Sequence, residues 1–379
     1  MNRPSSPRVL FWSEYYWPYI GGPEVMATRL LPALRDRGFR FTVLTSQHQL
    51  DLPPEDEVDG IPILRIPFRA PVEQGDMETF GRVVHRIEEI KRSGMPDLVH
   101  LLGLGTAALY QMKTARTFPA PLLVTLQNRL LTDGGAAGDT LQSRVLGAAD
   151  GVVACSAAIR EEVARRVPTA SSRCVVIPNS IETPDRPPTP LPFQPPRLLC
   201  LGRLVPVKGF DLALTALAAI HDQIPDLCLT VAGDGPTRAG LERMAAEAGL
   251  ESVVRFTGWV RPGDIPDLIN EATIVLLPSR EREGLPVVAV QAALMGRPMI
   301  ATPVGGLPEI VVHGVTGLIV EEEDPRALAK AITALLDRPH TARAMGERAR
   351  LHALDRFGWE AHVDAYEHTY RRLIAGRSP

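Results

Sequence analysis

Two positive side chains stand five residues apart in a glycine-bounded segment near the middle of the chain. In GRLVPVKGFD, Arg203 and Lys208 follow an apolar run, and Gly209 stands where a helix is expected to begin. Two cations beside the free N–H groups of a helix start suit a diphosphate, because that end of a helix attracts anions. Taken alone, the segment also fits an ordinary solvated basic loop.

A carboxylate lies in a second loop further along. The segment from Pro278 to Leu285 reads as a loop, Pro286 suits the first turn of a helix, and Gly296 suits its end. A phosphate would fit at the start of this helix while Glu283 reaches the hydroxyl groups of a sugar. We therefore expect this stretch to be the strongest part of a sugar-nucleotide site.

Other glycine-rich turns are weaker candidates for the same site. Gly233–Gly235 forms a tight turn after an expected strand, and Arg255–Val260 ends a strand at a glycine where backbone groups could edge a flat base. Gly21 and Gly22 stand between the first strand and its helix. Glycine lets the backbone approach a ligand closely, although each of these turns is also common without any ligand.

One glycine pattern points to a different ligand. Gly103, Gly105 and Ala108 follow a strand with the spacing of a dinucleotide-binding turn. That fingerprint requires an acidic residue about 20 positions on, at the end of the next strand. Here the next strand is followed by Gln127, so binding of NAD is disfavoured.

Short apolar runs alternate with helical patterns along the chain, and this alternation is typical of parallel sheets covered by helices. In the first half we expect strands at Arg8–Phe11, Phe41–Thr45, Leu98–Leu101, Leu122–Leu126, Gly151–Ala154 and Cys174–Ile177, with a helix at Glu24–Arg37. In the second half we expect strands at Arg197–Leu201, Leu227–Ala232, Val254–Phe256, Ile274–Leu277, Met299–Ala301 and Leu318–Val320, helices at Phe210–Ile220, Arg238–Ala248 and Val287–Met295, and helix throughout Pro325–Ile374.

A proline-rich stretch separates the two halves. Residues 184–196 contain seven prolines, which forbid a helix or a central strand and favour a stiff extended linker. The predicted fold class is α/β, with two doubly wound Rossmann-like domains facing each other across a cleft. We place the first domain at 1–183, the linker at 184–196, the second domain at 197–358 and a terminal helix at 359–379.

Composition excludes several classes of protein. The 379 residues carry 41 basic and 44 acidic side chains, and aromatics make up 5%, which argues against nucleic-acid binding. Cys155, Cys174, Cys200 and Cys228 have no metal-ligand or paired spacing and read as small core residues. No apolar run is long enough to cross a membrane, so we expect a soluble, cytoplasmic protein. Nothing indicates an oligomeric state.

With these motifs in order, the chain resembles the retaining GT-B glycosyltransferases of family 4, the group 1 glycosyl transferases. The resemblance rests on YYWPYIGGPE, VVIPNSIE, GRLVPVKGFD, VAGDGP, FTGWV, PSREREGLPVV and TPVGGLPEIVVHGVTGLIV, and it covers nearly the whole chain. The closing segment FGWEAHVDAYEHTYRRL looks like the family's terminal helix, which crosses back to the first domain.

The resemblance implies roles for individual residues. Arg203 and Lys208 would bind the donor's diphosphate and stabilise the leaving group, and Glu283 would contact the transferred sugar. The backbone N–H groups of Gly284, Leu285 and Val287 would lie nearby, and Gly22 would belong to a loop that closes over the donor. The family needs no divalent metal or other cofactor, and no Asp-x-Asp occurs here to hold one.

Two positions depart from the family pattern. The family has an acid eight positions after the first glutamate, where it grips the ribose, and here that position is Gln291. An amide has one acceptor oxygen and no charge, so the exchange weakens nucleotide binding by roughly 1 kcal/mol. The family also commonly has a histidine where this chain has Gln127, which cannot titrate.

Several interpretations stay open at this point. The chain is an active transferase with an ordinary donor, a transferase with an unusual donor, a degenerate binding or regulatory subunit, or a sugar-nucleotide epimerase. Its acceptor is a carbohydrate, a lipid-linked molecule or another small molecule, read by variable loops such as Arg129–Thr140. The basic helix expected at Gly81–Gly94 either contacts an anionic membrane surface peripherally or packs on the sheet as an ordinary surface helix.

Overall fold

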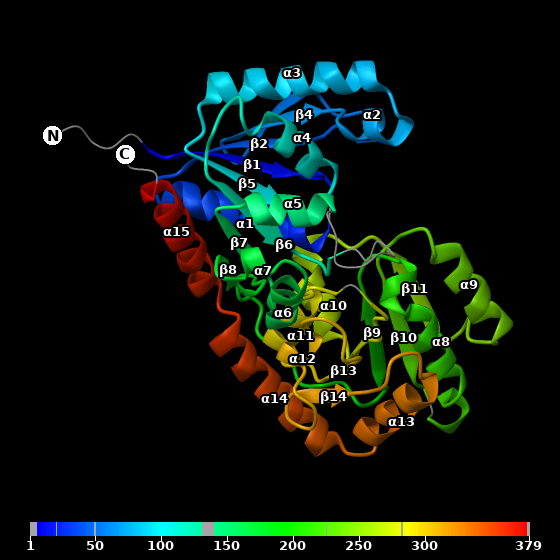
Figure 1. Ribbon diagram of the computed structural model, residues 1–379. Coiled ribbons are helices and arrows are strands. Elements are labelled where there is room, and N and C mark those ends of the chain that lie inside the picture. The colour runs from blue at the N-terminus through cyan, green and yellow to red at the C-terminus, as the bar shows by residue number, and fades with distance from the viewer. Residues whose placement is uncertain are drawn as a thin grey trace. The chain divides into compact units, whose positions relative to one another are not determined.

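The computed structural model describes residues 6–19, 21–48, 51–130, 140–224, 226–281 and 283–376. The chain divides into two compact units (Figure 1). The first comprises Met1–Pro178 together with Glu360–Pro379, and the second comprises Asn179–Trp359. The terminal helix therefore returns to the first unit, as the sequence indicates.

The first unit is built on one sheet, which has eight strands in the described residues. Their order is β3-β4-β2-β1-β5-β6-β7-β8, and all neighbours are parallel except β3 and β4. The strands are β1 (Arg8–Ser13), β2 (Arg40–Ser46), β3 (Glu55–Val58), β4 (Ile61–Ile66), β5 (Leu98–Leu102), β6 (Leu122–Leu126), β7 (Gly151–Ala154) and β8 (Cys174–Val176). The six strands expected here are all present, and β3 and β4 are additional.

Helices connect these strands, and Figure 1 shows α2, α3 and α4 gathered on one side of the sheet. They are α1 (Gly22–Asp36), α2 (Arg69–Gln74), α3 (Met77–Gly94), α4 (Thr106–Thr114), α5 (Leu141–Ala148), α6 (Ala157–Arg166), α7 (Pro168–Ser171) and α15 (Trp359–Ala375). Side-chain caps begin several of them. Asp76, Thr140 and Ser156 each accept a hydrogen bond from the N–H three residues on, which satisfies a donor that the helix itself leaves unpaired.

Helix α15 is fastened to the first sheet by a buried polar network. Nδ1 of His100, on β5, lies 2.6 Å from the Tyr370 hydroxyl, and its Nε2 lies 2.8 Å from the Thr125 hydroxyl on β6. Burial lowers the pKa of His100 to about 3. The ring is therefore neutral, and one nitrogen donates while the other accepts.

The second unit is built on a fully parallel sheet, six strands wide in the part of the chain that the structure describes, in the order β11-β10-β9-β12-β13-β14. The strands are β9 (Arg197–Leu201), β10 (Cys228–Ala232), β11 (Val254–Gly258), β12 (Ile274–Leu277), β13 (Met299–Ala301) and β14 (Gly317–Ile319). The helices are α8 (Phe210–Ala218), α9 (Arg238–Glu247), α10 (Ile265–Asn270), α11 (Val287–Leu294), α12 (Leu307–Ile310), α13 (Pro325–Leu336) and α14 (Pro339–Arg356), with 3-10 turns at Pro206–Lys208, His221–Gln223 and Pro262–Asp264. All strands and helices expected in this half are confirmed, with boundaries shifted by a few residues.

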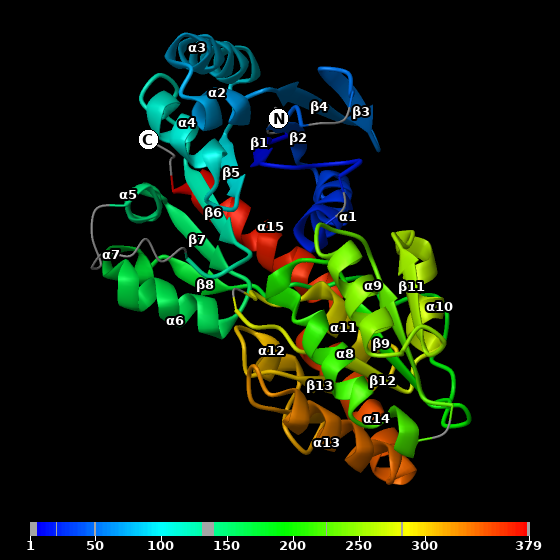
Figure 2. The ribbon, with the colours of Figure 1, turned by 90° about the vertical axis from the view of Figure 1, so that its right-hand side faces the viewer.

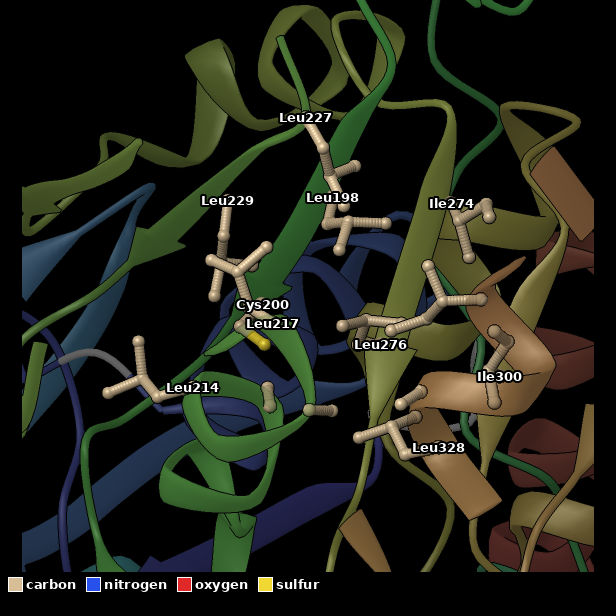
Figure 3. Close-up of a cluster of buried hydrophobic side chains, with 14 of the residues drawn as sticks. Leu198, Cys200, Leu214, Leu217, Leu227, Leu229, Ile274, Leu276, Ile300 and Leu328 are labelled. Carbon is tan, nitrogen blue, oxygen red and sulfur yellow. The ribbon is translucent and has the colours of Figure 1, made fainter. Parts of the chain in front are cut away.

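An apolar core lies on one face of this sheet, where α8 and α13 pack against each other (Figure 2). Alternate strand residues point into it, and Figure 3 shows Leu198, Cys200, Leu229 and Leu276 meeting Leu217 of α8. Each fully buried leucine contributes roughly 1.5–3 kcal/mol relative to an exposed one. Cys200 serves here as a small apolar side chain, and Cys155 and Cys174 are likewise buried in the first unit.

The proline-rich segment is not a free linker between the units. Residues 184–196 form no helix and no named strand, but they belong to the second unit. Leu191 enters the core, and the buried guanidinium of Arg297 donates to the Thr189 carbonyl at 2.7 Å. The prolines correctly predict the irregular backbone. The interpretation as a spacer overlooks Leu191 and Phe193, whose apolar side chains pack the segment against the core of the second unit.

Helix α3 is less basic on its surface than its sequence suggests. Lys91 is fully buried, and its ammonium donates to Gln111 at 2.6 Å and to Thr114 at 2.7 Å. Burial lowers the pKa of Lys91 to about 7. Arg82 and Arg86 pair with glutamates on their own helix, so the hypothesis of a basic membrane-binding face loses one of its four cations. Among the described residues no helix is both long and apolar enough to span a bilayer.

Buried neutral histidines predict acid sensitivity in the first unit. Burial lowers the pKa of His100 to about 3 and that of His362 to about 4, against 6.5 when unfolded. As the pH falls below 6.5, these histidines are therefore protonated in the unfolded chain but stay neutral in the folded chain. Each histidine lowers the unfolding free energy by up to about 1.4 kcal/mol per pH unit. His100→Gln should flatten the fall in unfolding free energy between about pH 6.5 and 5 by that amount, measured by urea unfolding. His85→Gln, on an exposed side chain, is the control, and an unchanged pH slope in His100→Gln would contradict the assignment.

Candidate active site

Ligands in doubly wound sheets bind beyond the carboxyl ends of the strands, where the strand order reverses direction. In the second sheet that reversal falls between β9 and β12. The loop after β9 carries Arg203 and Lys208, and the loop after β12 carries Glu283. The topology alone therefore brings the two segments singled out in the sequence to one point.

The side chains of these two loops meet directly. The Lys208 ammonium lies 2.5 Å from Oε1 of Glu283, and the Ser279 hydroxyl donates to the same oxygen at 2.7 Å. The Glu283 side chain is 9% exposed and that of Lys208 is 26% exposed. Within the described residues, Oε2 of Glu283 accepts no hydrogen bond. One carboxylate oxygen is thus fixed by the protein, and the other remains available to a ligand.

Glycines allow the loops to approach this closely. Gly209 has φ +64°, and a Cβ there would lie 2.0 Å from the carbonyl oxygen of Pro278. Gly305, in the loop after β13, has φ +56°, and its Cβ would lie 1.9 Å from the carbonyl oxygen of Glu283. Real Cβ contacts are never that short, so any other residue would force the loops apart. Both glycines are required by the backbone that holds Lys208 and Glu283.

The turn at Gly233–Gly235 supports the Arg203 loop in the same way. A Cβ at Gly233 would lie 1.9 Å from the Gly202 carbonyl oxygen, and one at Gly235 would lie 2.3 Å from that of Leu204. The Leu204 N–H also donates to the carbonyl of Asp234 at 2.9 Å. The structure thus gives these glycines a loop-packing role, in addition to the ligand-binding role expected from the sequence.

Helix α11 presents unpaired N–H groups beside Glu283. The carbonyls of Gly284 and Leu285 accept hydrogen bonds from Gly306 and Asn179. The N–H groups of Gly284, Leu285 and Val287 donate to no other residue in the described ranges. Pro286 stands before the helix and has no N–H to offer. Three buried donors at a helix start are the arrangement that proteins use for phosphate.

The remaining expected residues lie at the ends of other strands. Arg203 is exposed after β9, and Gln291 is buried on α11, where its amide has no hydrogen-bond partner among the described residues. Val260 follows β11 next to Trp259, an indole that is 54% exposed.

In the first unit, Gly21 precedes α1, Gly22 begins it, and Gln127 follows β6. The structure thus brings Lys208 and Glu283 into contact, and it places these three residues in the other unit. Residues 131–139, most of the loop expected to read the acceptor, lie outside the described residues.

The dinucleotide-like turn is filled by the chain itself. Oε1 of Glu14, which follows β1, accepts the Ala107 N–H at 2.6 Å at the start of α4. A Cβ at Gly105 would lie 2.5 Å from the same oxygen. Burial raises the pKa of Glu14, despite the hydrogen bond from Ala107 and the charge of Arg69, which lower it. The Glu14 carboxyl group therefore occupies the N–H at the start of α4, beside Gly105.

Two family models match the chain and leave little of it uncovered. Residues 21–180 match the glycosyl transferase 4-like domain, and residues 182–352 match glycosyl transferases group 1. The chain belongs to this family of GT-B glycosyltransferases. The resemblance seen in the motifs is therefore confirmed.

Relatives with names add detail about the family. A GDP-mannose-dependent alpha-(1-6)-phosphatidylinositol monomannoside mannosyltransferase from Mycolicibacterium smegmatis is 37% identical over 170 residues, which are 43% of this chain and 44% of that protein. A D-inositol 3-phosphate glycosyltransferase from Thermobispora bispora is 27% identical across 94% of this chain and 92% of its own length. The first match thus spans less than half of the relative, whereas the second spans nearly all of it.

Solved structures confirm the GT-B fold. A sucrose-phosphate synthase from Thermosynechococcus elongatus aligns with a TM-score of 0.85 over 98% of this chain and 100% of that one, at 23% identity. Anabaena HepE in complex with UDP and glucose aligns with a TM-score of 0.77 over 97% of this chain and 100% of that one, at 21% identity. At these identities the likeness shows the fold of this glycosyltransferase and nothing finer.

The residues that sequence reasoning missed are the supports of the site. Ser279 holds Glu283 from four residues away, and Arg280 binds Asp211 in the first turn of α8. The first contact lies within one short loop and could have been suspected from a hydroxyl so close to the carboxylate. The second joins residues 69 apart, for which the sequence carries no local signal.

Substitution of Gly209 tests the close approach of the loops. Gly209→Ala should lower the unfolding free energy of the second unit by more than Gly314→Ala, which introduces the same methyl group at φ +75° with no atom within 4 Å. Left-handed backbone costs alanine roughly 1–2 kcal/mol at either site, and displacing Pro278 adds about 1–3 kcal/mol at Gly209 alone. Urea unfolding of both variants measures the difference. Equal losses would mean that the loops have room to separate.

Proposed function

We propose that this glycosyltransferase moves a sugar from a nucleoside diphosphate to an acceptor hydroxyl, with retention of the anomeric configuration and without a divalent metal. The observation that carries the proposal is the contact of Lys208 with Glu283 at the point where the strand order reverses. Beside it lie the N–H groups of Gly284, Leu285 and Val287, which have no partner in the described residues.

The cations act on the leaving group. As the bond from the sugar's anomeric carbon to the phosphate oxygen breaks, its electron pair stays with the diphosphate. Lys208 and Arg203 stabilise that developing charge, because fixed positive groups in a partly water-excluded site interact far more strongly than in bulk water. A change that removes one such donor typically costs about 10²–10³-fold in turnover.

Glu283 orients the sugar. Its Oε1 is held by Lys208 and Ser279, and we assign Oε2 to accept a hydroxyl of the transferred sugar. The acceptor oxygen then attacks from the face that the diphosphate leaves, and its proton passes to the departing phosphate oxygen. No protein nucleophile is required in this scheme, which agrees with the role of Glu283 as a hydrogen-bond acceptor.

The positive groups of the protein near the expected diphosphate are the reason to propose a metal-independent reaction. No group of three His, Cys, Asp or Glu side chains with the geometry for a metal ion occurs in the described part of the chain. We propose that the two cations and the helix start carry out the charge stabilisation that a metal performs elsewhere. Activity that survives a chelator would support this part of the proposal.

The substrates are proposed from the named relatives. Those relatives include a GDP-mannose-dependent phosphatidylinositol monomannoside mannosyltransferase and D-inositol 3-phosphate glycosyltransferases. GDP-mannose as donor, with inositol phosphate or phosphatidylinositol mannoside acceptors, therefore comes first in a screen. The intact pair of Lys208 and Glu283 favours catalysis over a degenerate binding subunit. A sugar-nucleotide epimerase differs in forming product without any acceptor.

In this proposal Gln291 sets how strongly the site binds the ribose of the nucleotide. The amide is buried and has no partner among the described residues, and we assign it to bond one ribose hydroxyl. A carboxylate there would accept two, and hydrogen bonds to charged groups exceed neutral ones by roughly 1 kcal/mol.

A nucleotide panel tests the proposal. One nucleoside diphosphate among UDP, GDP, ADP, TDP and CDP should raise the melting temperature of the wild type, and Gln291→Glu should bind that nucleotide about fivefold more tightly. The double variant Arg203→Ala/Lys208→Ala should lose the effect. No response to any member, in wild type and Gln291→Glu alike, would contradict a nucleotide-sugar site.

A further inference from the structure

Arg280 makes an unusual number of contacts for a residue that the reaction does not use. It lies in the loop after β12, three residues before Glu283. Its guanidinium donates to both carboxylate oxygens of Asp211, at 2.7 and 2.6 Å, and to the Pro206 carbonyl at 2.9 Å. It also donates to Glu323 at 2.5 Å. All of these partners belong to the second unit.

The backbone of Arg280 joins the same two loops. Its N–H donates to the Val207 carbonyl at 2.9 Å, directly before Lys208 in the chain. Arg280 therefore fixes the segment 206–211 through the carbonyls of Pro206 and Val207 and through Asp211 in the first turn of α8. Because Lys208 is inside that segment and Glu283 is inside Arg280's own loop, the position of Arg280 sets the separation of the pair.

The positive charge of Arg280 is compensated by two carboxylates of the protein. Asp211 and Glu323 neutralise it, and its side chain is 23% exposed. Burial alone raises the pKa of Asp211, but the hydrogen bonds and charge of Arg280 outweigh it, and the net shift is downward. The ion pair is therefore intact at neutral pH, and the proposed function assigns the diphosphate to Arg203 and Lys208 and not to Arg280.

The loop after β14 bears strain where it meets Arg280. Glu323 has φ +56°, a left-handed conformation that costs a non-glycine residue roughly 1–2 kcal/mol. Its carboxylate is the one that reaches Arg280. This ion pair brings a third segment, which follows the edge strand β14, to the same guanidinium and to the loop that carries Glu283.

We propose that Arg280 is a positioning residue of the donor site, which holds Lys208 and Glu283 at their working separation without touching the donor. The proposal rests on the proposed function of that pair. Arginine is required, because a planar guanidinium can bond Asp211 with two parallel N–H groups and still reach a carbonyl and a second carboxylate. Lysine keeps the charge but concentrates its donors at one point.

Kinetics of Arg280→Lys test the proposal with a double-mutant design. The variant should lose about 10–100-fold in kcat while its affinity for the free nucleoside diphosphate changes less than about threefold, because misplacement of reacting groups by about 1 Å has that effect. In a Glu283→Gln background the same substitution should cost clearly less, since Arg280 acts in part through Glu283. Arg371→Lys, at an exposed ion pair with Glu367 on α15, is the control and should leave kcat unchanged.

An equal loss from Arg280→Lys with and without Glu283→Gln would overturn the proposal, because Arg280 would then act independently of the pair. A large fall in nucleotide affinity would also overturn it, because it would make Arg280 a ligand of the donor.

Hydrogen exchange separates this proposal from the proposed function. In Arg280→Lys the amides of residues 203–211 should exchange at least about tenfold faster than in Arg371→Lys, whatever the enzyme transfers. An unchanged exchange rate there means that Arg280 does not hold the loop, and the positioning proposal fails. Absence of transfer by the wild type with every donor, together with faster exchange in Arg280→Lys, refutes the proposed function and retains the loop-holding role.

Discussion

The contact between the Lys208 ammonium and the Glu283 carboxylate is the interaction on which the second unit's site depends. The two residues are 75 apart in sequence and 2.5 Å apart in space. They meet because β9 and β12 are neighbours in the sheet and their following loops leave the same edge. A single oxygen of Glu283 receives both Lys208 and Ser279, so the carboxylate is oriented before any ligand arrives.

Most unusual features nearby serve to keep that contact in place. Gly209 and Gly305 remove side-chain atoms that would push the loops apart. Arg280 joins the loops by charge and by backbone. The cost of the left-handed backbone at Glu323 is offset by the stability of an apolar core beneath the sheet. Preorganisation of this kind is what allows charged groups to stabilise a leaving diphosphate without rearranging first.

The sequence predicts the strands well for a physical reason. Strands buried on both faces of a parallel sheet are continuous apolar runs. Leu122–Leu126 is such a run, and β6 has the bounds that the sequence predicts. β3 escapes the same reasoning, because it is the acidic segment Glu55–Val58 at the sheet's edge, with no apolar run to detect. In β4 the apolar residues are interrupted by Pro62 and Arg65. The proline-rich segment is predicted as irregular, and only packing in three dimensions shows that Leu191 belongs to a core.

For the site, spacing predicts the residues that stand near glycines and helix starts, namely Lys208, Glu283 and their loops. It cannot predict partners brought together by the fold. Asp211 and Glu323 lie 69 and 43 residues from Arg280, and nothing local marks them. The glycines after β5 show a different limit of spacing, since nothing local predicts that the Glu14 carboxyl group, 93 residues away, bonds the N–H of Ala107.

Calorimetric titration tests the central claim most directly, with a nucleoside diphosphate and its sugar-bearing form measured against two variants. Lys208→Met should weaken both ligands by about tenfold or more, because it removes a charge from the diphosphate site. Glu283→Gln should leave the diphosphate nearly unaffected and abolish only the additional affinity that the sugar provides. Equal weakening of both ligands by Glu283→Gln would contradict the division of roles between the two side chains.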